Sequence, residues 1–149
     1  MKKIIFFILL LLIIIQFFRI DKTNPASDIN VDFVNLTSPP IEISALLKNS
    51  CYDCHSLHTK YPWYSNIAPI SWILKSHVND GRKHVNFSEW RQLSNNKKDH
   101  VLEEIVEVLN NGEMPLTGYA FLHPEADLSI EQRDKMINWV NSIRVLYKK

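Results

Sequence analysis

The sequence predicts an all-α fold, a small helical domain preceded by an apolar N-terminal helix. Three observations predict this class. Apolar residues recur three and four positions apart in several segments, which is the spacing of one face of an α-helix. Almost no segment alternates apolar and polar residues as a half-buried strand does. Several of the seven prolines and three glycines stand at the ends of these helical segments, and 149 residues allow one such domain.

The first twenty residues form a targeting or anchoring segment. Two lysines stand near the N-terminus, residues 4–15 are an unbroken apolar run, and Phe17, Phe18 and Ile20 extend it. As a helix, residues 4–20 would span about 25 Å, slightly less than the roughly 30 Å hydrocarbon core of a bilayer. A cleaved signal peptide also has this length, but no small-residue cleavage site follows closely. We expect an uncleaved, single-pass transmembrane helix in the cytoplasmic (inner) membrane, with the domain in the periplasm or outside.

Residues 21–40 show no periodic pattern, so we expect a linker without a fold of its own. From Ile41 the pattern becomes helical, and this helix leads directly to Cys51. Its predicted inward residues are Ile43, Leu46 and Leu47. The predicted domain covers residues 41–147.

The segment Cys51-Tyr52-Asp53-Cys54-His55 contains the only two cysteines of the chain. Two cysteines three positions apart, followed by a histidine, are the attachment pattern of a c-type haem. The two thiols bind the vinyl groups of the porphyrin, and the adjacent imidazole reaches the iron as its proximal ligand. The segment therefore predicts one covalently attached haem c, held by Cys51 and Cys54, with His55 as a metal ligand.

The same five residues have three other readings. A structural disulfide between the two cysteines fits the spacing. A thioredoxin-like redox pair belongs at a helix start inside a βαβ unit, and strand patterns are nearly absent here. Half of a zinc site would need further thiolates or a second pair of ligands, and no third cysteine exists.

An aromatic segment, residues 61–69, follows the attachment motif without a helical period. We expect its rings to pack against the porphyrin or its edge. Pro69 then opens a short helix that Gly81 ends. The expected apolar stripe of this helix is Ile70, Ile73, Leu74, His77 and Val78. A histidine in such a stripe is either a buried residue with satisfied hydrogen bonds or a second iron ligand.

A longer helix, from about residue 97 to 111, stops at Gly112, and Met114 follows immediately. A thioether is a soft, neutral ligand that binds haem iron and raises its reduction potential. The chain between His55 and Met114 is long enough to return on the opposite face of the porphyrin. We predict Met114 as the distal iron ligand, with His77 and His123 as alternatives.

The last helix begins at Ser129, which forms a capping box with Gln132, and runs to about Tyr147. We expect it to pack against the helix before Cys51 and to close the fold around the haem. The remaining histidines, His58, His84 and His100, are predicted surface or loop residues.

The charge balance argues against nucleic acid as a partner. Three of the 17 basic residues, Lys2, Lys3 and Arg19, lie in the N-terminal segment, so the rest of the chain has 14 basic and 16 acidic side chains. Nucleic-acid binding calls for a clustered basic surface instead.

Short motifs extend from the attachment segment nearly to the end of the chain. They are Cys51-Tyr52-Asp53-Cys54-His55, Tyr61-Pro62-Trp63-Tyr64, Ala68-Pro69, Ser71-Trp72, His77-Val78, Gly81-Arg82, Phe87-Ser88-Glu89-Trp90, Gly112-Glu113-Met114-Pro115 and His123-Pro124. This combination resembles the bacterial haem-binding domain family of small cytochrome-c-like proteins. The resemblance covers about residues 41–147. It implies one covalently bound haem, an N-terminal membrane segment and an exported domain, but no particular reaction.

The leading functional hypothesis is a membrane-anchored monohaem c-type cytochrome that passes single electrons between redox partner proteins on the periplasmic side. Two filled axial positions suit electron transfer better than catalysis. The alternative is a haem-based gas or peroxide sensor, or an enzyme, with an open distal site. A third hypothesis is a thiol redox module that uses Cys51 and Cys54 without haem.

Overall fold

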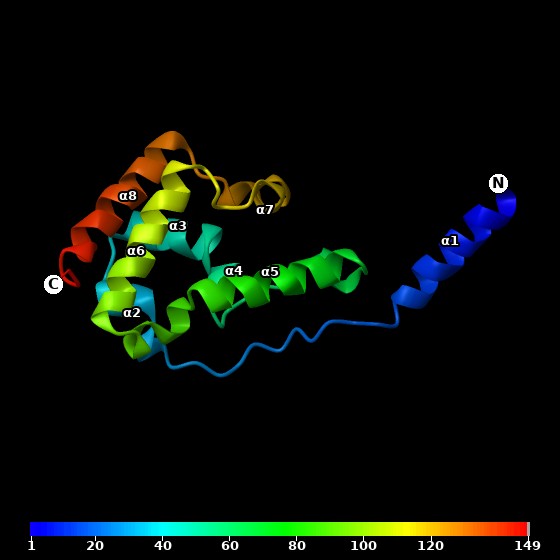
Figure 1. Ribbon diagram of the computed structural model, residues 1–149, viewed down its shortest axis with the longest axis horizontal. Helices are drawn as coiled ribbons and strands as arrows, with labels where there is room; N and C mark the ends of the chain where they lie inside the picture. The colour runs from blue at the N-terminus through cyan, green and yellow to red at the C-terminus, as the bar shows by residue number, and fades with distance from the viewer. Residues whose placement is uncertain (149) are drawn as a thin grey trace.

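The computed structural model describes residues 1–148, and every regular element in this range is helical (Figure 1). The predicted all-α class is confirmed. The longer helices are α1 (Lys2–Ile15), α3 (Ile41–Ser50), α5 (Ile70–His84), α6 (Asn95–Asn110) and α8 (Ile130–Arg144). The short helices are α2 (Phe33–Thr37), α4 (Tyr52–His55) and α7 (Thr117–Leu122), with 3₁₀ turns η1 (Ile29–Val31), η2 (Trp63–Asn66), η3 (Phe87–Gln92) and η4 (Pro124–Ala126).

Helices α6 and α8 lie side by side and antiparallel, and α3 also packs against α8 (Figure 1). The predicted contact between the last helix and the helix before the motif is thus confirmed, although α6 is the main partner of α8. Ser94 caps α6 by accepting a hydrogen bond from the backbone N–H of Lys97 at 3.3 Å. Ser129 and Gln132 form the predicted capping box of α8, which ends at Arg144 rather than near Tyr147.

Residues 29–37 are part of the core, so the expectation of a structureless linker over residues 21–40 is wrong for this segment. Phe33 is fully buried, and its ring contacts those of Phe87, Trp90 and Trp139 at centroid distances of 5.0, 4.5 and 5.7 Å. The α2 helix that carries Phe33 is only five residues long. Such a helix is too short to show a hydrophobic period, and the sequence pattern therefore could not reveal it.

Helix α1 ends at Ile15, earlier than the predicted end at Ile20. The side chain of the next residue, Gln16, donates to the backbone oxygen of Leu12 at 2.8 Å. It also exchanges two hydrogen bonds of 3.0 Å with the backbone of Ala68, and these bonds turn the chain onto the domain. Across residues 1–148, the structure contains no helix with both the length and the apolar character needed to cross a membrane.

Helix α5 differs from its predicted form in length and in orientation. It continues through Gly81 to His84, and its buried residues are Ser71, Leu74, Val78 and Gly81. The predicted stripe residues Ile70, Ile73 and His77 are exposed instead. The prediction followed the largest apolar residues, whereas the small residues Ser71 and Gly81 allow the closest packing against η2 and α4.

We predict that Phe33→Ala lowers the free energy of unfolding by about 3–5 kcal/mol, because it empties a fully buried aromatic site. Chemical denaturation followed by circular dichroism measures this change. Ile29→Ala is the matched control, since Ile29 is 63% exposed and its truncation should change stability by no more than about 0.5 kcal/mol. Equal stabilities of the two variants would show that residues 29–37 do not belong to the cooperative core.

Candidate functional site

A cavity of about 540 Å³ lies between α4, the second half of α5, α6 and the segment that follows α6. Cofactor pockets commonly measure about 300–1,000 Å³. The four predicted site residues Cys51, Cys54, His55 and Met114 all line this cavity. Its apolar walls come from Leu47, Val85, Phe87, Val101, Ile105, Leu109 and Met136.

Tyr52 and Asp53, the two residues between the cysteines, hold the attachment segment in place through hydrogen bonds to different parts of the fold. The buried Tyr52 donates its hydroxyl hydrogen to the carboxylate of Asp32 at 2.7 Å. Asp53 accepts hydrogen bonds from the backbone N–H of Lys60 at 2.9 Å and from the hydroxyl of Tyr119 at 2.7 Å. Burial and the bond to Asp53 both raise the pKa of Tyr119, so this hydroxyl stays protonated as a donor. These bonds hold both cysteines at the cavity wall.

The imidazole of His55 is oriented by a backbone carbonyl. Its Nδ1 lies 3.3 Å from the carbonyl oxygen of Val85, the residue directly after α5. Because a carbonyl can only accept, Nδ1 carries the proton in the neutral ring and Nε2 keeps a free lone pair. Burial lowers the pKa of His55 and thereby favours this neutral form. A neutral imidazole with one nitrogen held by a carbonyl is the usual state of a metal-binding histidine.

Both cysteines are half-buried and their thiols are free, which bears on the alternatives to haem. Burial, with a smaller effect of the neighbouring Cys54, raises the pKa of Cys51 to about 12. Burial, followed by the charge of Asp53, raises the pKa of Cys54 to about 11. Thioredoxin-like pairs depend on a thiol of lowered pKa, so this site has the opposite character. In residues 1–148, no cluster of three or more His, Cys, Asp or Glu side chains is arranged to hold a metal ion, and the zinc reading gains no support.

The turn at the end of α6 brings Met114 to the cavity. Gly112 adopts φ +69°, a left-handed conformation that favours glycine, and turns the chain out of the helix. The backbone N–H of Glu113 then bonds the carbonyl of Val108 at 3.0 Å, and the guanidinium of Arg133 donates to the carbonyl of Met114. Met114 is therefore held half-buried at the cavity wall on a loop fixed at both ends.

The alternative distal residues have different positions. His77 is exposed and lies at the rim of the cavity. His123 does not line the cavity: its Nε2 lies 2.8 Å from the hydroxyl of Tyr64, and its ring stacks on Tyr119 at 4.4 Å. The structure therefore brings His77 to the cavity lining, whereas His123 lies against Tyr119, which itself lines the cavity.

No residue of the aromatic segment 61–69 lines the cavity, although Tyr61 and Tyr64 pack in one apolar cluster with Cys54, which does. The packing of these rings against the porphyrin stays a prediction. Tyr64 is buried against α5 and bonded to His123, whereas Trp63 is 74% exposed. The density of rings along the sequence did not show which way they face.

Three residues that the sequence did not single out contribute to the cavity wall. His84, predicted as a surface or loop residue, is exposed but reaches the cavity from the last turn of α5. Met136 is fully buried and lines the cavity from α8. Ser50 is buried, and its hydroxyl has no hydrogen-bond partner within the described part of the chain. No spacing in the sequence connects these residues with the motif.

The rim of the cavity is acidic. It is lined by the carboxylates of Asp53, Asp80, Glu104, Glu107 and Glu113, and among residues 1–148 no lysine or arginine lines it. Asp53 is bonded inside the fold and Asp80 pairs with Lys83 at 3.0 Å, but Glu107 and Glu113 are exposed. The opening of the cavity therefore presents a negative potential to the solvent.

The residues present fit a covalently held haem. Two thiols, a neutral imidazole with a free Nε2 and a thioether line one cavity whose walls are mainly apolar. The unpartnered hydroxyl of Ser50 in the same wall can donate to a polar group of a bound molecule. The donor set and its surroundings thus agree with the chemistry that the motif predicts.

The comparisons with known proteins point to the same cofactor. The family model described as "Haem-binding domain" matches residues 10–142. Neither the comparison with curated proteins nor the comparison with solved structures gave a match. The match extends from within α1 nearly to the end of α8, so it includes the cavity and all four predicted site residues.

Gly81 allows the close approach of α5 to the attachment segment. A Cβ at this position would lie 2.7 Å from the carbonyl oxygen of Cys54 and 3.2 Å from the Cys54 Cβ. The two nearest atoms, the carbonyl oxygen and carbon of Cys54, belong to the backbone and cannot move without displacing the cysteine. An alanine here would push α5 and α4 apart.

We predict that Gly81→Ala destabilises the protein by about 1–3 kcal/mol and lowers the yield of haem-containing protein. Thermal unfolding and the ratio of haem absorbance to protein measure the two effects. Gly118→Ala is the matched control, since nothing lies within 4 Å of a Cβ at this helical position and alanine favours the helix. A Gly81→Ala variant as stable as Gly118→Ala would contradict the importance of the contact.

Proposed function

Because this chain belongs to the haem-binding domain family, we propose that it is a membrane-anchored monohaem c-type cytochrome that transfers single electrons in the periplasm. Haem binding follows from the family. The covalent attachment, the electron transfer and the location are the proposal. The observation that carries it is the convergence of Cys51, Cys54, His55 and Met114 on one cavity.

Cys51 and Cys54 hold the porphyrin in this proposal. Their S–H groups would add across the two vinyl groups of the porphyrin, each sulfur bonding one vinyl carbon while the hydrogen goes to the other. Both thiols are protonated at neutral pH, since burial raises their pKa to about 12 and about 11.

His55 and Met114 are the two proposed axial ligands. His55 offers Nε2 because Val85 holds Nδ1, and Met114 offers its sulfur from the fixed loop after α6. Haem supplies an iron that takes up and gives back one electron. If His55 and Met114 both held the iron, no position would remain for a substrate or gas, and this favours electron transfer.

The N-terminal segment supports the proposed anchoring in the cytoplasmic membrane. None of the residues of α1 is buried against the domain, and large apolar side chains cover the helix. Lys2 and Lys3 at its start favour a cytoplasmic N-terminus and a periplasmic domain. Attachment to the membrane would raise the local concentration of membrane-bound electron donors.

The acidic rim supports a redox partner with a basic docking surface. Electron-transfer partners approach the exposed edge of the cofactor, and complementary charge speeds their association. The exposed carboxylates of Glu107 and Glu113 stand at the opening through which such a partner would approach.

We predict that ferric protein, matured in a host with c-type haem assembly, shows the weak far-red charge-transfer band of methionine-ligated haem. Met114→Ala should abolish the band and let the ferrous form bind carbon monoxide, because it empties the distal position. Absorption spectra of both oxidation states measure these changes. Haem that stays with the chain after denaturation tests the covalent attachment.

Met136→Leu is the matched control, since Met136 lines the same cavity from α8. It should keep the band and exclude carbon monoxide. A band lost in Met136→Leu and kept in Met114→Ala would reverse the assignment. Rapid binding of carbon monoxide to the unsubstituted protein would instead favour a gas or peroxide sensor, or an enzyme, with an open site.

We predict that the protein exchanges electrons faster with cationic hexaammineruthenium than the double variant Glu107→Gln/Glu113→Gln does, by roughly two- to five-fold at low salt. The difference should shrink as ionic strength rises, and anionic hexacyanoferrate should show the opposite order. Stopped-flow absorbance measures both rates. Glu131→Gln on α8, outside the cavity lining, is the control and should leave both rates unchanged.

A further inference from the structure

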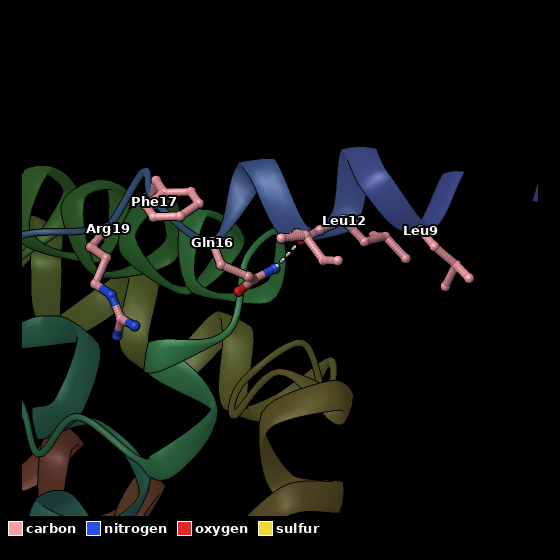
Figure 2. A pocket seen from close by; sticks show the side chains of 6 residues that line it. Leu9, Leu12, Gln16, Phe17 and Arg19 are labelled. Atoms are coloured by element: carbon pink, nitrogen blue, oxygen red, sulfur yellow. Dashed lines mark hydrogen bonds between the residues drawn. The ribbon is translucent and has the colours of Figure 1, made fainter. Parts of the chain in front are cut away.

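The chain that leaves α1 is bonded to the domain without an intervening tether. Gln16, the residue directly after the helix, exchanges two 3.0 Å hydrogen bonds with the backbone of Ala68. The indole N–H of Trp72 donates to the carbonyl of Phe18 at 2.8 Å, and the ammonium of Lys75 donates to the carbonyl of Asp21 at 2.7 Å. Figure 2 shows Gln16 pointing from the end of α1 toward the domain, with Phe17 and Arg19 following along α5.

Further contacts continue this attachment along the domain. Lys22 bonds the side chain of Asn66 at 2.6 Å, and Asn24 donates to the carbonyl of Thr59 at 2.9 Å. Arg82 donates to the side chain of Asn24 at 3.3 Å. Residues 16–24 are therefore a strap along the domain rather than a free linker.

Exposed apolar side chains gather where the strap begins. They come from the strap itself, from η2 and from the first turns of α5, which point toward the end from which α1 emerges (Figure 1). Trp63 is 74% exposed, Phe17 82% and Ile73 55%. We define the apolar face by Phe17, Phe18, Trp63, Ile70, Trp72 and Ile73.

The length of α1 argues for the membrane as the occupant of this face. Fourteen residues of helix span about 21 Å, against the roughly 30 Å of a hydrocarbon core. When an apolar helix is shorter than the hydrocarbon core, the bilayer becomes thinner around it, and the residues that flank the helix enter the lipid interface. Because Gln16 is bonded directly to Ala68, the residues drawn in are those of the apolar face. Tryptophan rings are also the side chains best suited to this layer.

The charges beside the apolar face fit the same occupant. Arg19 and Lys22 lie on the strap, and Lys75 lies one turn beyond Trp72 on α5. Basic residues next to an apolar surface are attracted to anionic lipid headgroups.

We propose that the apolar face lies in the lipid interface of the membrane that receives α1, so that the domain is held in one orientation on the membrane surface. This inference rests on the proposed insertion of α1. The Gln16–Ala68 hydrogen bonds act as the clamp that brings the face to the lipid.

Site-directed spin labelling of the full-length haem protein tests this proposal. Haem occupies Cys51 and Cys54, so a single introduced cysteine can carry a nitroxide in vesicles of phosphatidylcholine and phosphatidylglycerol. The collision rates with oxygen, which prefers lipid, and with a nickel chelate, which prefers water, report the surroundings of the label. We expect the oxygen-to-nickel ratio at Trp63→Cys and Ile70→Cys to exceed that at Leu146→Cys several-fold. Leu146 is the matched control, because it is also 74% exposed and lies near the C-terminus, at the end of the molecule remote from α1 (Figure 1).

A label at Leu9→Cys tests the insertion of α1 separately from the lipid contact of the apolar face. If this label contacts lipid while those at Trp63 and Ile70 match Leu146→Cys, the oriented face is overturned and the anchor stands. If the label at Leu9 contacts water, both are overturned. Adding Gln16→Ala should lower the ratio at Trp63→Cys several-fold and leave Leu9→Cys unchanged, and an unchanged ratio at Trp63 would overturn the role of the clamp.

Discussion

The contact between Gly81 and the carbonyl of Cys54 decides how the haem-binding half of the domain is arranged. Only a residue without a side chain allows α5 to lie this close to the attachment segment, since a Cβ would come within 2.7 Å of the Cys54 oxygen. The same approach brings Val85, at the end of α5, to 3.3 Å from Nδ1 of His55. The orientation of the predicted proximal ligand therefore depends on the position of a whole helix.

Helix α5 also joins the cavity to the strap. Its last turns carry Gly81 and His84 at the cavity, and its first turns carry Trp72, which holds the backbone of Phe18. The rise from Ile70 to Gly81 is about 16 Å at 1.5 Å per residue. In the proposed arrangement, this one rigid element sets the height of the cofactor above the membrane.

The signals that predicted the site residues are local. The cysteines and His55 form one short motif, Met114 follows the Gly112 stop, and the structure brings all four residues to one cavity. The Ser129 capping box, also a local signal, is confirmed. The burial of Phe33 and the true face of α5 were not predictable, since both depend on partners distant in the sequence. Gly81 illustrates the difference. Glycine often ends a helix, but Gly81 lies inside α5, where the lack of a side chain allows close packing against Cys54. A side-chain hydrogen bond to a backbone group far away in the sequence, such as that of Gln16 to Ala68, leaves no trace in residue patterns.

The strap changes what membrane attachment would do for this protein. A flexible linker of twenty residues has a root-mean-square end-to-end distance of roughly 25 Å. Such a linker raises the local concentration of its domain at the membrane but does not fix the orientation of the domain. The strap removes this freedom, so orientation has to come from the surface of the domain. The charges agree with one orientation: Lys22 and Lys75 lie near the apolar face, whereas the carboxylates of Glu107 and Glu113 lie at the cavity rim. In the proposed arrangement, anionic headgroups would attract the first pair and repel the second, and the rim would face partners in solution rather than lipid.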